Sequence, residues 1–108
     1  MRSKRFDGVV IHFVETDAAW SASVLAKSDG WCVLCGKPAT PAHIISRRYA
    51  PTRLAVENGQ PLCVKCHRWY DELPPGRARH VACLLVGPDV FDVLQRLSVT
   101  GREVTKWE

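Results

Sequence analysis

The pattern of apolar positions predicts a chain of short strands and amphipathic helices. Residues 8–14 are rich in β-branched side chains and predict a strand or an extended lead-in. A helix at about 17–28 is indicated next, because Trp20 and Val24 recur at helical spacing and Thr16 is a good cap residue. An Asp-Gly pair ends that helical pattern.

The middle of the chain holds fewer apolar runs and many turn formers. Residues 43–45 predict a short strand, and residues 61–63 predict the beginning of another. Residues 66–72 lack Gly and Pro and predict a short helix. Residues 77–86 and 89–97 predict two further helices, separated by Gly-Pro. We therefore expect an α+β fold.

Length and apolar content bound the class of protein. The chain has 108 residues, enough for one small domain. A domain of this size buries a modest fraction of its surface, so that a metal ion would help it to fold. Its apolar runs are too short to cross a bilayer, and its beginning lacks the long apolar stretch of a secretory signal. We expect a cytoplasmic protein without membrane contact.

The positive charge is concentrated in the middle of the chain. The formal net charge is +4. Residues 27–80 contain nine Lys or Arg and four Asp or Glu, a balance of +5, and the remainder has a balance of −1. A basic patch suits a polyanion such as nucleic acid, although a merely solvated basic surface explains the charge as well.

Four of the five cysteines form two C-x-x-C pairs, Cys32/Cys35 and Cys63/Cys66, with 27 residues between the pairs. An odd cysteine count without an export signal argues against disulfides. Four thiolates make the closed tetrahedral shell of structural zinc. The alternatives are two unrelated pairs of buried cysteines or a redox C-x-x-C. The remaining Cys83 lies in an apolar run, which predicts a buried core thiol.

The segment enclosed by these cysteines carries a further pattern. His43 follows the first pair, Asn58 lies in Glu-Asn-Gly, and His67 directly follows the second pair. This order resembles the HNH endonuclease family, most closely its small phage-encoded members, which carry a similar "HII-x-R…TR…ENG…LC-x-x-CH-x-W" run. The resemblance covers residues 31–74 closely and the flanking helices loosely. It implies that residues 1–108 form one HNH domain, with a ββα-metal core stapled by the four-cysteine zinc site and flanked by helices.

The resemblance also implies roles for individual residues. His43 matches the general base that deprotonates the attacking water, Asn58 matches the residue that holds the loop between the strands, and His67 matches a ligand of a catalytic cation. Asp71, one helical turn later, sits where a second ligand is expected, but a solvated helix residue would look the same. Asn58 would equally suit a turn, because Asn and Gly tolerate positive φ.

The chemistry of these side chains suits the implied roles. A neutral imidazole accepts a proton at cellular pH. His67 and Asp71 lie at i and i+4, on one helix face, where a carboxylate suits Mg²⁺ or Mn²⁺ and an imidazole suits Mn²⁺, Ni²⁺ or Zn²⁺. Ala42 departs from the family, because many members carry an Asp or His ligand immediately before the base. Water or phosphate oxygens would have to fill that position, or the site is weak or inactive.

Three arginines are candidate DNA contacts in the loop that follows His43. These are Arg47, Arg48 and Arg53. A guanidinium forks onto phosphate oxygens, which positions a backbone without reading its sequence, although each arginine alone is equally well a solvated charge. His12 and His80 have no motif around them and are expected to be structural or surface residues.

Together these features predict a metal-dependent DNA endonuclease, nicking or cutting both strands with weak sequence specificity. It would act as a monomer or dimer, and a phage packaging or recombination partner would follow from family analogy alone. The rival interpretation is a non-catalytic zinc-binding module that docks on DNA or on a protein. A site-specific zinc finger is a further alternative.

Overall fold

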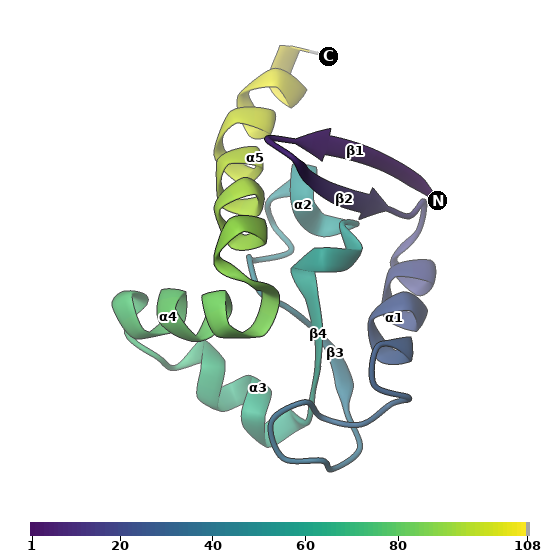
Figure 1. Cartoon of the computed structure of the whole chain (residues 1–108), viewed down its shortest axis with the longest axis vertical. Coiled ribbons are helices and arrows are strands. Elements are labelled where there is room, and N and C mark those ends of the chain that lie inside the picture. The colour runs from purple at the N-terminus through teal and green to yellow at the C-terminus, as the bar shows by residue number, and fades with distance from the viewer. Residues whose placement is uncertain (108) are drawn as a thin grey trace.

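Two antiparallel hairpins and a set of helices make up this α+β chain (Figure 1), for which the computed structural model describes the backbone of residues 1–107 and the side chains of residues 1–99. The strands are β1 (Arg2–Phe6) paired with β2 (Val9–Phe13), and β3 (Thr40–His43) paired with β4 (Gly59–Leu62). The helices are α1 (Asp17–Ala26), α2 (Ala50–Arg53), the 3₁₀ turn η1 (Val56–Asn58), α3 (Val64–Asp71), α4 (Pro75–Val86) and α5 (Pro88–Trp107).

The N-terminal hairpin turns at Asp7 and Gly8, whose φ angles are 50° and 82°. Positive φ at both central residues matches the twist of an antiparallel hairpin, which explains the Asp-Gly pair there. The predicted strand at 8–14 is confirmed as β2, and its Ile11 is buried against Leu94 of α5. The partner strand β1 was not predicted, because its side chains are almost all exposed and polar and carry no alternating pattern.

Helix α1 confirms the predicted helix at 17–28. The Thr16 side chain accepts a hydrogen bond of 3.0 Å from the Ala19 amide, which caps the first turn. Trp20 and Val24 are buried, as their spacing predicted. They face β4 at Gly59, where a Cβ atom would come within 2.2 Å of the Val24 Cγ2 atom.

The second hairpin differs from the predicted strands by several residues. The strands were expected to begin at residues 43 and 61, but β3 ends at His43 and β4 ends at Leu62. Ile44 and Ile45 form a bend after the strand, where Ile44 packs in one apolar cluster and Ile45 contacts that cluster and a second one. The prediction was wrong because an apolar run indicates burial and does not by itself distinguish a strand from a buried bend.

The three helices after the second hairpin are present, with longer bounds than predicted. Helix α3 begins at Val64 because the Cys63 side chain caps it, accepting from the Cys66 amide at 3.3 Å. Helix α4 begins at Pro75, a favoured first residue, and α5 continues to Trp107. Within the described residues, no helix combines the length and apolar character needed to cross a membrane.

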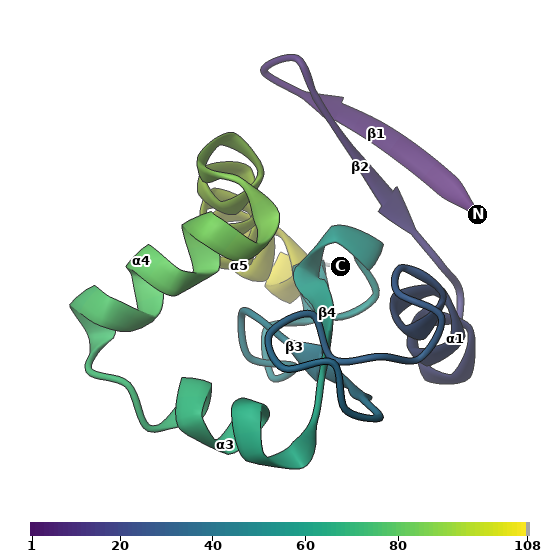
Figure 2. The same ribbon diagram turned by 60° about the horizontal axis from the view of Figure 1, so that its bottom comes forward.

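The β3–β4 hairpin lies between two groups of helices. In Figure 2, α1 is on one side of the hairpin and α3 with α4 is on the other, as in Figure 1. Ile44, which follows β3, packs with Tyr70 of α3, Ala82 of α4 and Phe91 of α5. The hairpin therefore carries His43, the last residue of β3, between these two groups of helices.

Candidate functional site

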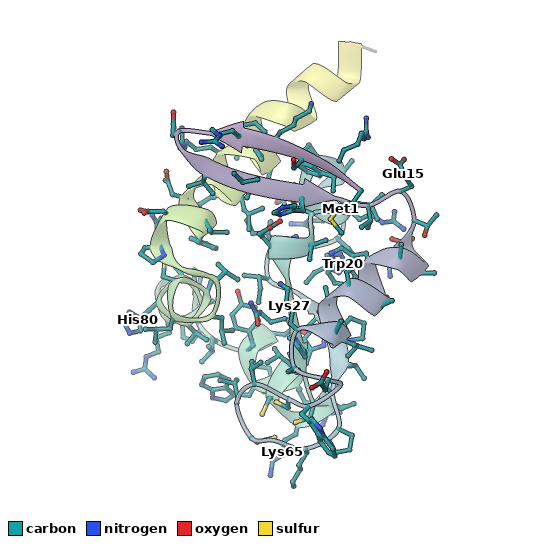
Figure 3. The ribbon with its side chains drawn as sticks, turned by 45° about the vertical axis from the view of Figure 1, so that its right-hand side comes forward. Met1, Glu15, Trp20, Lys27, Lys65 and His80 are labelled. Carbon is teal, nitrogen blue, oxygen red and sulfur yellow. The ribbon has the colours of Figure 1, made fainter. Side chains whose placement is uncertain are left out.

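The four cysteines of the two C-x-x-C pairs come together at one end of the molecule. Their sulfur atoms all lie within 4.8 Å of one another, and the Cys35 and Cys63 sulfurs are 3.4 Å apart. Figure 3 shows yellow sulfur atoms gathered at the end where Lys65 lies. Cys83 of α4 is outside this cluster and is half-buried against an apolar cluster, whereas a buried core thiol was predicted.

The cluster fits a tetrahedral metal ion. Zinc bound by thiolates at about 2.3 Å places neighbouring sulfurs roughly 3.8 Å apart, within the span of this cluster. Burial opposes ionisation of the Cys32 thiol, but hydrogen bonds with the backbone of Cys63, Cys35 and Leu34 outweigh it and lower the Cys32 pKa to about 6. The sulfurs can therefore hold a metal ion such as structural zinc, as their spacing predicted.

His67 and Asp71, whose side chains are of kinds that can bind a cation, project from α3. The His67 Nε2 atom lies 3.3 Å from the Asp71 Oδ2 atom, one helical turn away. Both side chains are partly open to solvent, with exposed fractions of 33% and 60%. The predicted i, i+4 pairing is therefore present, and both donor atoms remain accessible from outside.

His43 is held at the end of β3 with one nitrogen engaged. Its Nε2 atom lies 2.9 Å from the Arg53 carbonyl oxygen. A carbonyl only accepts hydrogen bonds, so the neutral ring carries its hydrogen on Nε2 and keeps the lone pair on Nδ1. Burial lowers the pKa of His43 and outweighs the hydrogen bond to the Arg53 carbonyl, which raises it, while the charges of Arg47 and Arg53 lower it and that of Asp17 raises it. The ring is therefore neutral at pH 7 and can accept a proton.

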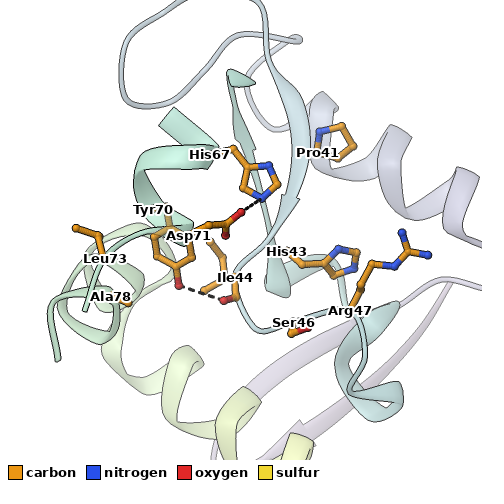
Figure 4. A pocket seen from close by; sticks show the side chains of 10 residues that line it. All are labelled: Pro41, His43, Ile44, Ser46, Arg47, His67, Tyr70, Asp71, Leu73 and Ala78. Carbon is orange, nitrogen blue, oxygen red and sulfur yellow. Dashed lines mark hydrogen bonds and ion pairs between the residues drawn. The ribbon is translucent and has the colours of Figure 1, made fainter. Parts of the chain in front are cut away.

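One cavity of about 500 Å³ connects these groups: His43, His67 and Asp71 all line it, together with Ser46 and Arg47. Figure 4 shows His67 and Asp71 pointing toward one another from α3. In that view His43 extends on the other side of its strand, next to Arg47. The cavity therefore brings the three predicted residues to one opening, with the imidazole and the α3 pair at different parts of its wall.

Asn58 is fully buried and ties the loop after β3 to the start of β4. Its Oδ1 atom accepts from the Ile45 amide at 2.8 Å, and its Nδ2 atom donates to the carbonyls of Ile45 and Thr52 at 3.0 and 3.1 Å. The sequence suggested that Asn58 and Gly59 suit a turn because they tolerate positive φ. Neither residue has positive φ, so that reason was wrong. Gly59 is instead required by the close approach of α1.

The three candidate DNA-binding arginines differ in their surroundings. Arg47 is exposed and lines the cavity beside His43. Arg48 lies over the Tyr49 ring at 5.2 Å from its centroid. Arg53 forms an ion pair with Asp17 of α1, and its Nε donates to that carboxylate at 3.0 Å. The structure therefore brings only Arg47 to the cavity wall.

Ala42 is buried among the zinc-site residues and does not line the cavity. It is 0% exposed and packs with Cys32, Leu62 and Cys63. A carboxylate or imidazole in its place would have to displace this apolar packing. Among the described residues, the protein donors around the cavity that suit a cation are therefore those of α3.

The remaining predictions concern His12 and His80. His12 pairs with Glu57, with 2.6 Å between Nδ1 and the carboxylate oxygen, and acts structurally. His80 is exposed on α4. Both lie away from the cavity lining, as expected of structural or surface residues.

Residues that the sequence did not indicate also contribute to the site. The Trp20 ring stacks on the His43 ring, with centroids 3.8 Å apart and an interplanar angle of 7°. The Lys27 ammonium donates to the carbonyls of Val56 and Gly59 at 2.8 and 2.7 Å, so this charge holds the backbone. No local sequence signal could reveal these contacts, because their partners lie 23 to 32 positions away.

Comparisons of the chain with protein-family models, with curated proteins and with solved structures give no match.

Proposed function

We propose that the protein is a metal-dependent DNA endonuclease of the HNH type, with β3, β4 and α3 as its ββα-metal core. The observation that carries the proposal is the shared cavity, because His43, whose Nε2 is held by a carbonyl, and the His67–Asp71 pair all line it. Proton acceptor and cation ligands in one cleft are what phosphodiester hydrolysis requires.

His43 acts as the general base in this proposal. Its Nδ1 lone pair takes a proton from water, and the resulting hydroxide oxygen bonds to phosphorus while the bond from phosphorus to the 3′ oxygen breaks. The 3′ oxygen takes a proton from solvent, so the products are a 5′-phosphate and a 3′-hydroxyl. The Arg53 carbonyl fixes the ring edge opposite the reacting nitrogen.

His67 and Asp71 would hold the catalytic cation. Ligands about 2.1 Å from a six-coordinate ion lie roughly 3 Å apart when adjacent, close to the 3.3 Å between their donor atoms. When bound, such an ion would neutralise the charge that builds on the leaving oxygen. Two protein ligands leave the other positions to water and phosphate, and the imidazole favours Mn²⁺ or Ni²⁺ over Mg²⁺.

The substrate is proposed to be DNA because exposed arginines, which can bind phosphate, lie at the cavity wall and on the loop beside it. Arg47 beside His43 supplies a phosphate contact at the cavity wall. Arg48 is a second contact on the exposed loop, whereas the ion pair of Arg53 with Asp17 suits it to a structural role. Contacts to phosphates give weak sequence specificity and a steep salt dependence.

Asn58 is proposed to be a positioning residue for the base. Its side chain binds both backbone groups of Ile45, two residues after His43, and the carbonyl of Thr52, just before Arg53. The loop that carries the hydrogen-bond partner of His43 is therefore held by one buried amide.

The rival function is a non-catalytic zinc module that docks on DNA or on a protein. The observation that favours it is the buried Ala42, which leaves the cation with two protein ligands among the described residues. This module would bind DNA through the same arginines, Arg47 and Arg48, but would not cleave it.

Nicking of supercoiled plasmid separates the two functions. The zinc-loaded protein is assayed with Mg²⁺, Mn²⁺ or Ni²⁺, beside His43→Ala and the control His80→Ala, which removes an exposed histidine outside the cavity. We expect His43→Ala to lower the rate by a factor of about 10² to 10⁴ and His80→Ala to leave it unchanged. Plasmid binding without nicking under all three ions would establish the rival function.

A further inference from the structure

We propose that Trp20 of α1 is a positioning residue for His43, holding the imidazole at the tilt from which Nδ1 meets the attacking water. This inference rests on the proposed nuclease function. It extends the site to a helix outside residues 31–74, the segment that carries the sequence motif.

The stack and the hydrogen bond of His43 constrain its ring in different ways. The bond from Nε2 to the Arg53 carbonyl fixes one edge of the ring but allows tilting about that bond. The parallel Trp20 ring, 3.8 Å away and inclined by 7°, covers one face and removes that freedom. Together the two contacts hold the His43 ring in one orientation, so its Nδ1 lone pair points in a single direction.

The indole itself is rigidly placed. Trp20 is 3% exposed, and its Nε1–H donates to the Ala55 carbonyl at 2.8 Å. Gly59 lets the indole approach the hairpin, because a Cβ atom there would lie 2.7 Å from Trp20 Cζ2. Figure 3 shows Trp20 on the side of α1 that faces the rest of the molecule. A platform fixed in this way can fix the ring stacked on it.

Helix α1 also holds the second partner of His43. Asp17, in its first turn, pairs with the Arg53 guanidinium, and the carbonyl of that same Arg53 accepts from His43. Both constraints on the imidazole therefore lead to α1, one through Trp20 and one through Asp17. This agreement argues for a positioning role rather than a chance contact in the core.

The stack also affects when His43 can act as a base. Burial lowers its pKa, and the charged groups that act on the ring are Arg47 of the loop, Arg53 of α2 and Asp17 of α1. Loss of the indole readmits water to one face, which raises the pKa toward its ordinary value near 6.5. A base works only when unprotonated, so the acid limb of the rate profile would move to higher pH.

Steady-state nicking by the zinc-loaded protein tests the inference through Trp20→Leu, which removes the flat ring, and Trp20→Phe, which keeps one. The matched control is Val24→Ala, which truncates the next buried residue of the same helix face. We expect Trp20→Leu to lower kcat by about 10- to 100-fold with KM within about twofold, and to move the acid limb upward. Trp20→Phe should recover most of kcat, and Val24→Ala should leave both the kcat and the limb unchanged.

A nuclear magnetic resonance titration of the His43 ring without DNA provides a readout that does not depend on cleavage. In Trp20→Leu the pKa should rise and the ring nitrogens should average between tautomers, and Trp20→Phe should restore both. If Trp20→Leu fails to fold, Trp20→Met, which fills the space without a planar face, replaces it. The inference is overturned if the pKa and tautomer of His43 are unchanged in Trp20→Leu or Trp20→Met. It is also overturned if Val24→Ala lowers kcat as much as Trp20→Leu does. If the His43 pKa and tautomer change in the variants but the wild-type protein cleaves no DNA, the nuclease function is refuted. The conclusion that Trp20 positions the His43 ring would then still hold.

Discussion

Replacing Asn58 by alanine tests how strongly one buried amide holds the loop that follows β3. The wild-type side chain makes three hydrogen bonds, to both backbone groups of Ile45 and to the Thr52 carbonyl. Asn58→Ala leaves one amide hydrogen and two carbonyl oxygens without these partners. Asn58 is 0% exposed, so these groups are shielded from bulk water.

The cost follows from those three groups. A buried polar group left without a partner costs about 1 to 3 kcal/mol, and Ile45 is only half-buried, so we expect a loss of about 3 to 5 kcal/mol in all. That is a large part of the roughly 5 to 15 kcal/mol by which small domains are stable. At a typical urea dependence, the unfolding midpoint would fall by roughly 2 to 3 M.

Urea unfolding followed by circular dichroism, with zinc in excess, measures this loss. The matched control is Gln60→Ala, which removes another side-chain amide that makes one hydrogen bond, of 3.2 Å, to the Leu85 carbonyl. The control should cost about 1 kcal/mol. If Asn58→Ala costs no more than Gln60→Ala, then the amide does not hold the loop and the reasoning is refuted.

Three further substitutions test the metal site, the packing of α1 and the contact with DNA. Cys63→Ser should abolish the folded circular dichroism spectrum because it removes a zinc ligand, whereas Cys83→Ser should keep it; a folded Cys63→Ser protein would mean that the metal is not structural. Gly59→Ala should lower the free energy of unfolding, measured by thermal denaturation, by about 3 kcal/mol, because the new Cβ atom clashes with α1. The control is Gly76→Ala, whose Cβ atom meets nothing within 4 Å, and equal effects of the two substitutions would exclude the clash. Arg47→Ala should weaken DNA binding, measured by fluorescence anisotropy, and should reduce the slope of log affinity against log salt concentration by about 1. An unaltered slope would show that Arg47 does not contact DNA phosphate.

Features that depend on neighbours along the chain could be predicted from the sequence. The Thr16 cap and the buried face of α1 follow from local spacing. The two C-x-x-C pairs are separated by 27 residues, and their spacing alone does not show that they meet. They could be predicted to meet because four thiolates complete the shell of one metal ion. The His67–Asp71 pair likewise follows from helical geometry.

Features that depend on distant partners could not be predicted. Trp20 has the spacing of a core residue, and nothing near it indicates that it stacks on His43. Arg53 resembles a free phosphate contact until α1 brings Asp17 beside it. Gly59 resembles a turn glycine because the helix that excludes a side chain there comes from more than 30 residues earlier. In each case the determining contact is created by the placement of α1 against the second hairpin.

The central claim, that the base and the cation ligands serve one cavity, can be measured with Mn²⁺ as a paramagnetic probe. Mn²⁺ is titrated into the zinc-loaded protein while the resonances of the four histidine rings are followed. The account predicts that His67 broadens first and His43 next, ahead of His80, and that Asp71→Ala removes this pattern. A His43 resonance that stays sharp while His67 broadens would place the ion too far from the base and contradict the account.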